Sequence, residues 1–193
     1  LSFTVENGGG GDWAFSLANY ETFFRKAHYV RTLWRSIGIS SLVALVTVLL
    51  AYPAAYFIAF HVKTNKMLWL ILITLPFWTS YLLRVFAWKL ILGFNGVVNS
   101  SLMWLGMIDR PLEFILYNTN AVVLTLAHAW AAFAILPIFV SLQKIDKSLI
   151  EAAHDLGENH IATFVRVSLP LSMPGVVAAL LLVFIPTVGD YVT

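Results

Sequence analysis

Four long runs of this sequence contain no Asp, Glu, Lys or Arg, and they decide what the chain can fold into. They cover residues 36–60, 67–83, 114–143 and 167–189, which are 25, 17, 30 and 23 residues long. A helix rises about 1.5 Å per residue, so about 20 residues are needed to cross about 30 Å of hydrocarbon. Three runs are long enough. The second becomes so if it extends toward Leu92 with Arg84 and Lys89 snorkelling to the interface.

Composition supports membrane helices over a soluble core. The 193 residues are 60% hydrophobic and 11% charged, with a mean hydropathy of +0.82, whereas soluble domains have roughly 25% charged residues. A soluble chain of this size does not bury so much apolar surface. Run lengths and the lack of alternation favour helices over barrel strands. The predicted fold class is therefore all-α, a polytopic membrane helix bundle.

Several function classes lack their signatures. The net charge of +2 and the absence of a basic run argue against a nucleic-acid partner. There is no cysteine for a thiolate metal site, and no two of the five histidines are spaced i, i+4. No phosphate-binding G-x-x-x-x-G-K loop occurs. His154 and Asp155 have no nucleophile placed by a motif, so a hydrolase is a poor interpretation. We predict no catalytic residue and no metal site.

Each predicted span contains a proline away from its ends, namely Pro53, Pro76, Pro137 and Pro186. Proline removes one backbone donor and clashes with the preceding turn. One interpretation is kinks that serve packing. The other is broken helices that line a transport path. Four prolines in four spans favour a moving bundle that lines a cavity.

A short polar segment, "EAAHDLGENHIATFVRVSLP" (residues 151–170), separates the third and fourth runs. Ser148 and Glu151 have the spacing of a capping box, which predicts a helix start and a first helix running to Leu156. Gly157 stands where a left-handed C-terminal residue is needed. Asn159 is placed to cap a second short helix that ends before Pro170. We expect a helix–glycine turn–helix outside the membrane.

The first of these helices has a distinctive predicted surface. Its apolar stripe comprises Leu149, Ala152, Ala153 and Leu156, and its acidic edge comprises Glu151, Asp155 and Glu158. A solvated face is the usual explanation of such an edge. A knob with an apolar centre and a charged rim is also typical of a small protein–protein contact.

The segment resembles the cytoplasmic loop signature of ABC transporter permeases. The matching residues are Glu151-Ala152-Ala153, Gly157, Val167 and Leu169-Pro170, with Val where Ile is more usual. "LPFWTSYLLRVFAWKLIL", "LMWLGMIDRPLEFILYN", "KIDKSLIEAAHDLG" and "VFIPTVGDYV" are similar to the spermidine/putrescine subfamily. This resemblance covers roughly residues 20–193.

The resemblance implies a type I binding-protein-dependent importer permease of the bacterial inner membrane. Residues 1–32 would be extracytoplasmic and residues 33–193 the transmembrane domain. Its spans would cover about 33–60, 67–92, 116–142 and 171–189, with a cytoplasmic coupling loop at 143–170. The apolar pattern still runs at "FIPTVGDYVT", so we interpret the chain as a fragment that lacks the first and last transmembrane helices of the family.

The resemblance also implies partners. Such permeases work with a second homologous permease, a cytoplasmic ABC ATPase dimer that binds ATP and Mg²⁺, and a periplasmic solute-binding protein. No cofactor is expected in this chain. The residues expected to couple it to the ATPase are Glu151, Ala152, Ala153, Asp155, Leu156 and Gly157.

A path for polyamines should offer carboxylates and aromatic faces, because ammonium groups are attracted to both. Asp190 is the expected carboxylate, since an acid close to a span is costly and often functional. The expected aromatic faces are Tyr191, Trp78 and Tyr81. Arg84 and Lys89 would repel a polycation unless they face headgroups or pair with Asp109 or Glu113. His128 is expected to make a hydrogen-bonded helix contact.

Two transport alternatives stay open. A proton- or sodium-coupled secondary transporter would suit broken helices, but it does not account for the E-A-A loop. A permease of the same family for another solute, such as an amino-acid derivative or an anion, accounts for every motif equally well.

Overall fold

The computed structural model describes residues 4–6, 13–15, 18–112 and 118–190. The chain divides into two compact units, Leu1–Ile39 and Ser40–Thr193. In the first unit, strand β1 (Thr4–Glu6) pairs antiparallel with β2 (Trp13–Phe15), and helix α1 (Ala18–Arg25) follows. The described part of the second unit is helices and short connections, and the described candidate site residues all lie in it.

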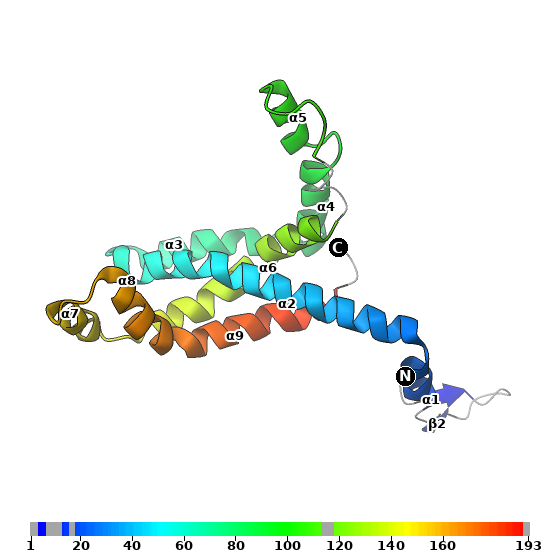
Figure 1. Ribbon diagram of the computed structural model, residues 1–193, viewed down its shortest axis with the longest axis horizontal. Coiled ribbons are helices and arrows are strands. Elements are labelled where there is room, and N and C mark those ends of the chain that lie inside the picture. The colour runs from blue at the N-terminus through cyan, green and yellow to red at the C-terminus, as the bar shows by residue number, and fades with distance from the viewer. Residues whose placement is uncertain (1–3, 7–12, 16–17, 113–117, 191–193) are drawn as a thin grey trace. The chain divides into compact units, whose positions relative to one another are not determined.

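The boundary between the units falls inside helix α2 (Ala27–Tyr56). The elements that follow α2 are, in order, the π-helical turn η1 (Phe57–His61), α3 (Lys66–Thr74), the 3₁₀ turn η2 (Leu75–Trp78), α4 (Tyr81–Leu92), α5 (Val97–Trp104), α6 (Thr119–Gln143), α7 (Lys147–Asp155), α8 (His160–Thr163), the π-helical turn η4 (Phe164–Ser168) and α9 (Leu169–Val188). Figure 1 shows α3, α6 and α9 running alongside one another, with α7 and α8 at one end.

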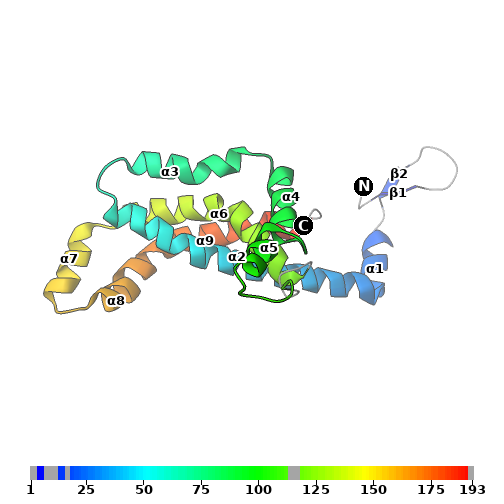
Figure 2. The same cartoon turned by 90° about the horizontal axis from the view of Figure 1, so that it is seen from above.

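Four helical runs among the described residues are long and apolar enough to cross a bilayer: Ala27–His61, Tyr81–Trp104, Thr119–Gln143 and His160–Val188. The run Tyr81–Trp104 is not straight, because a turn at residues 93–96 separates α4 from α5. Both views show α4 leaving the direction of α3 and leading to α5 (Figures 1 and 2). The expectation of an all-α polytopic membrane bundle is confirmed, the two short strands of the first unit aside.

Helix α6 provides most of the core of the second unit. It is apolar on every side, as expected of a helix that neighbours cover all round, and it contacts α9, α4, α3 and η1. Its fully buried side chains include Ile138 and Leu142. The closest packing is between α6 and α9, where Gly175 lies against the backbone of Pro137.

The predicted span at residues 67–92 is not one continuous helix in the structure. The helix stops at Trp78, and Thr79 and Ser80 are extended, with ψ angles of 152° and 134°. The Thr79 hydroxyl and backbone N–H both donate to the Pro76 carbonyl, at 2.6 and 3.3 Å, and so end the 3₁₀ turn. A new helix then begins at Tyr81. The break thus follows directly on the turn that contains Pro76.

The prolines do not act alike. Pro53, Pro137 and Pro186 lie inside helices that continue through them, as does Pro174. Of the four prolines singled out in the sequence, Pro76 is the one beside a break. The expectation of broken helices therefore holds at one of these four sites.

Candidate functional site

Helix α7 begins at Lys147, and its N-cap is Asp146, whose carboxylate accepts the backbone N–H of Ser148 at 3.0 Å. The predicted capping box with Ser148 as the cap is therefore wrong. An aspartate is as good a cap as serine, and Asp146 stands where the backbone is still extended. Hydrogen bonds from the backbone N–H and then the side chain of Ser148 lower the pKa of Asp146.

Replacing Asp146 by alanine should loosen the first turn of α7. We expect the Ser148 amide to exchange several-fold faster, because its acceptor is gone. Because folding lowers the pKa of Asp146, the charged cap stabilises the helix fully at pH values above 3.8, the ordinary pKa. This stabilisation is lost as the pH falls through the lower pKa of the folded state. Hydrogen–deuterium exchange of the purified protein measures both effects. Asp146→Asn is the control, since asparagine caps equally well, and its protection should not depend on pH. Equal protection in Asp146→Ala contradicts the capping role.

The turn after α7 is built on Gly157, which has a φ of +85°. Its N–H donates to the His154 carbonyl at 2.9 Å, and the N–H of Glu158 donates to the Ala153 carbonyl at 3.0 Å. These two bonds form a Schellman motif, which needs a left-handed residue at this position. The left-handed glycine predicted from the sequence is confirmed.

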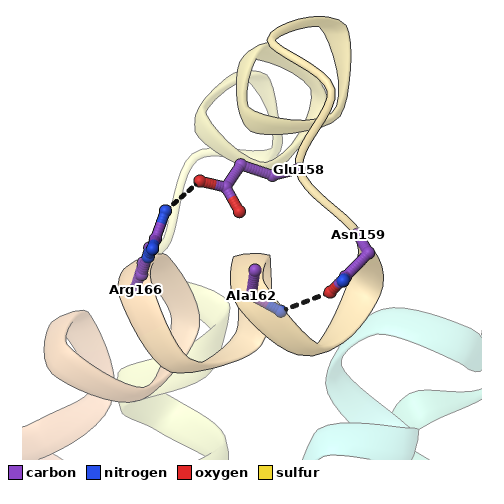
Figure 3. Close-up of polar contacts among 4 residues, drawn as sticks. All are labelled: Glu158, Asn159, Ala162 and Arg166. Atoms are coloured by element: carbon purple, nitrogen blue, oxygen red, sulfur yellow. Dashed lines mark hydrogen bonds and ion pairs between the residues drawn. The ribbon is translucent and has the colours of Figure 1, made fainter.

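Two polar contacts fix the chain after the turn (Figure 3). The Asn159 side chain accepts the backbone N–H of Ala162 at 2.8 Å, so the predicted cap of α8 is confirmed. Arg166 donates to the Glu158 carboxylate, which ties the turn to η4. The bond is exposed, so its contribution to stability is small. It joins the residue after the glycine turn to the turn that leads into α9.

The sequence predicted that the second short helix ends before Pro170, but the structure has no such end. Helix α8 passes into η4 and then into α9 without leaving helical geometry. In η4 the N–H of Leu169 donates to the Phe164 carbonyl, five residues back. Pro170 follows in the first turn of α9, where a missing N–H is tolerated. The π turn thus joins the polar segment directly to a membrane-length helix.

The predicted apolar stripe of α7 is divided between two faces. Ala153 is turned inward and is only 9% exposed. Leu149, Ala152 and Leu156 are exposed, Leu156 by 86%, as are Glu151 and Asp155. We call these five exposed residues the outer face of α7. It keeps an apolar centre and an acidic rim, and its role in coupling stays a prediction.

At the other end of α6 and α9, the structure brings together two of the four predicted path residues. The Tyr81 hydroxyl donates to the Asp190 carboxylate at 2.5 Å. Tyr81 opens α4 directly after the break, and Asp190 follows the end of α9 at Gly189. Trp78 does not join them and is 86% exposed. Tyr191 lies outside the described residues.

Aromatic rings not singled out in the sequence extend this pair. The Tyr81 and Trp130 ring centroids are 5.9 Å apart, and Trp130 lies 5.5 Å from Phe133. Phe133 meets the edge of Phe77 at 4.5 Å. We call Tyr81, Asp190 and these three rings the carboxylate–aromatic cluster. Trp130 and Phe133 are spaced i, i+3 and share a helix face, but their partners are about 50 residues away in the sequence.

Arg84 lies beside the cluster. Its guanidinium is 5.3 Å above the ring of Phe77, and its Nη1 donates to the Ala129 carbonyl at 2.9 Å. Lys89 stands over Phe86 at 5.8 Å. The carbonyl of Ala129 and the ring of Phe77 thus provide contacts for Arg84 that the sequence did not indicate. Glu113, one of the two acidic partners expected for Arg84 or Lys89, lies outside the described residues. The predicted contact of His128 is confirmed, because its Nδ1 accepts the indole N–H of Trp88 at 3.2 Å.

Comparison with known families decides what kind of protein carries these features. The family model of the binding-protein-dependent transport system inner membrane component matches residues 30–193. The chain belongs to this family. It is therefore a multi-pass inner-membrane protein of this family, and the resemblance seen in the sequence is confirmed.

Several relatives of this chain are named for transport. The spermidine/putrescine transport system permease protein PotB of Escherichia coli (strain K12) is 38% identical over 175 residues, which are 91% of this chain and 63% of that protein. PotB of Haemophilus influenzae is 37% identical, covering 99% of this chain and 66% of that one. The inner membrane ABC transporter permease protein YdcU of E. coli K12 is 32% identical, covering 92% and 60%. The chain thus spans about two thirds or less of these relatives' lengths.

Solved structures confirm the permease fold. A bacterial alginate ABC transporter, in complex with an alginate pentasaccharide-bound periplasmic protein, contains a chain that matches with a TM-score of 0.67 at 20% identity. The match covers 84% of this chain and 57% of that one. A second structure of an alginate-importing ABC transporter also gives a TM-score of 0.67. At this identity the likeness concerns the fold alone.

Proposed function

We propose that this permease is the membrane subunit of an ATP-driven, binding-protein-dependent importer, and that its solute is a polyamine such as putrescine or spermidine. The carboxylate–aromatic cluster is the observation that carries the solute assignment. An ammonium group is attracted to a carboxylate and to ring faces, by about 0.5–2 kcal/mol per ring. The relatives named for spermidine and putrescine transport support the same assignment.

The outer face of α7 is the proposed contact with the ATPase. Such a helix fits a cleft of a cytoplasmic ABC ATPase dimer, which binds ATP and Mg²⁺ and hydrolyses ATP, so this chain needs no cofactor of its own. Residues 143–170 are then cytoplasmic. Helix α6 has 25 residues and is about 37 Å long, and Trp130 and Phe133 lie near its middle. The carboxylate–aromatic cluster therefore extends from the middle of the bilayer toward Asp190, which follows the end of α9 on the periplasmic side. On that side a solute-binding protein would dock beside a second homologous permease.

The mechanism we propose is alternating access. Closure of the ATPase dimer displaces α7 and α8, and the continuous path through η4 transmits the displacement to α9. Asp190 follows the far end of α9, so movement of α9 changes the distance between Asp190 and Tyr81 on α4. The path between two permeases then opens to the loaded binding protein, and hydrolysis resets it.

A permease of the same family for an anionic or zwitterionic solute is the second candidate. Arg84 places a guanidinium beside the cluster, where it repels a polycation. Its Nε and the indole N–H of Trp130 are buried and have no hydrogen-bond partner in the described part of the chain. Two unpaired donors favour a carboxylate or another acceptor as ligand.

Neutralising Asp190 separates the two candidates. If the solute is a polyamine, Asp190→Asn in the full transporter should lower spermidine uptake by at least about tenfold, the equivalent of 1.4 kcal/mol. Tyr81→Phe is the matched control, since it removes the hydroxyl and leaves the carboxylate, and its loss should be smaller. Uptake of labelled spermidine by cells without their own polyamine transport measures both. Full spermidine uptake by Asp190→Asn, or loss of an anionic solute's uptake in Arg84→Gln, would favour the second candidate.

A further inference from the structure

The described residues of the second unit include two π-helical turns. One, η1, directly continues α2 at Phe57–His61, and the other, η4, connects α8 to α9 at Phe164–Ser168. A π turn holds one residue more than the α-helix it interrupts, and such turns occur often at functional sites. A hydrogen bond and ring contacts also join α2 to η4 and α9.

A buried hydrogen bond connects α2 and α9. The Tyr52 hydroxyl lies 2.8 Å from Ser172 Oγ, and both residues are almost fully buried. Ser172 Oγ donates its own hydrogen to the Leu169 carbonyl at 3.0 Å. Tyr52 is therefore the donor to Ser172. The bond joins residues 120 positions apart in the sequence. Ser172 lies near the start of α9, the helix to which η4 connects the polar segment.

Ring contacts surround this bond. The edges of Tyr52 and Tyr56 meet Phe164 of η4, with ring centroids 5.6 and 5.7 Å apart. Tyr56 also packs on Phe60 of η1 at 4.8 Å. Edge-to-face aromatic pairs have a preferred geometry, so they resist sliding. We call Tyr52, Tyr56, Phe164 and Ser172 the α2–α9 junction.

The hydroxyls next to the junction are not all satisfied. Ser168 Oγ in η4 and Thr163 Oγ1 in α8 are buried and have no hydrogen-bond partner among the described residues. A buried unpaired hydroxyl destabilises the arrangement that holds it. The two unpaired hydroxyls thus make the present position of η4 less stable, which lowers the free energy needed to move it.

We infer that Tyr52 is a positioning residue for energy coupling: through Ser172 and Phe164 it makes α2 follow when α7, α8 and η4 move. The inference rests on the proposed ATP-driven function. Without the junction, η4 and α9 move while α2 stays behind. ATP hydrolysis then continues, but the movement of the spans and the uptake per ATP decrease.

The test uses the full-length complex in lipid, with spin labels at Leu42→Cys on α2 and Ile185→Cys on α9, both exposed. Residues 1–193 contain no cysteine, and any cysteine elsewhere in the complex is replaced by serine before labelling. In the wild type, ATP should change the distance between the labels. In Tyr52→Phe and in Ser172→Ala we expect the change to be lost, the ATPase rate to be kept and the uptake per ATP to fall several-fold. The double variant should be no worse than either single one.

The matched control is Thr47→Val. Thr47 is buried on α2 as well, but its hydroxyl donates within its own helix to the Val43 carbonyl at 2.6 Å. This variant should behave as wild type. An ATP-driven distance change kept in Tyr52→Phe overturns the inference, as does equal loss of stability and ATPase rate in Thr47→Val and Tyr52→Phe. If the wild type responds to ATP without taking up polyamines, loss of the response in Tyr52→Phe still supports the junction. A wild type that ignores ATP contradicts the proposed function itself.

Discussion

The Gly157→Val variant should insert into the membrane at the wild-type level and take up almost no solute. Gly157 has a φ of +85°, and a Cβ there would meet nothing within 4 Å. The penalty is therefore backbone strain, which is roughly 1–2 kcal/mol for an ordinary L-residue and more for a β-branched one. A loss of that size reduces the population of the Schellman turn by roughly 5- to 30-fold. The outer face of α7 then no longer has a fixed orientation toward its partner.

Two variants control this experiment. Gly106 is also left-handed, with a φ of +68°, and also has free space around it. Gly106→Val introduces the same strain, but after α5 and outside the proposed coupling loop at residues 143–170. It should therefore leave uptake and ATPase coupling intact. Gly157→Asn should retain most activity, because asparagine adopts the left-handed region at a lower cost. Uptake and co-purification of the ATPase subunit are measured together. Normal uptake in Gly157→Val removes the turn from the coupling mechanism.

Gly175→Ala should lower the stability of the permease strongly, although it adds a single carbon atom. That Cβ would lie 2.5 Å from the Pro137 carbonyl oxygen and 2.5 Å from Cβ of Ser141. The first contact is with backbone and cannot be relieved by a rotamer change, so α6 and α9 must separate. Overpacking of this kind costs roughly 1–3 kcal/mol. We expect a lower thermal transition of the detergent-solubilised protein and a smaller amount in the membrane.

Partial rescue distinguishes the clash from a general effect of alanine. Ser141→Gly removes one of the two contacts and should restore part of the stability of Gly175→Ala. Gly189→Ala is the neutral control, because the added Cβ would lie 3.9 Å from the Pro186 carbonyl oxygen, which is an ordinary van der Waals contact. Wild-type stability of Gly175→Ala would show that α6 and α9 do not pack as closely as the structure has them.

Local chemistry explains which parts of the site could be predicted. Gly157 and Asn159 act on groups within five residues of themselves, so their roles follow from sequence spacing. The capping-box spacing to Glu151 favoured Ser148 as the cap of α7, but the structure places the cap two residues earlier, at Asp146. The break after Trp78 lies beside Pro76, but the other three prolines singled out in the sequence stand inside continuous helices, so proline alone does not predict where a helix breaks.

Contacts between distant segments were beyond prediction. Tyr81 and Asp190 were both singled out, but separately, and only the folded chain places them 2.5 Å apart. Trp130 and Phe133 read as ordinary core residues of an apolar run. Tyr52 and Ser172 lie in predicted spans without any local signal, because the bond between them depends on how α2 and α9 cross.

The most direct test of the central claim is uptake of labelled putrescine and spermidine into proteoliposomes. They would contain the full-length permease pair and its ATPase, with the binding protein outside and ATP inside. We predict that uptake requires both ATP and the binding protein and persists when ionophores collapse the ion gradients. Uptake that needs an ion gradient and no ATP would contradict the account, because it would make the protein a secondary transporter.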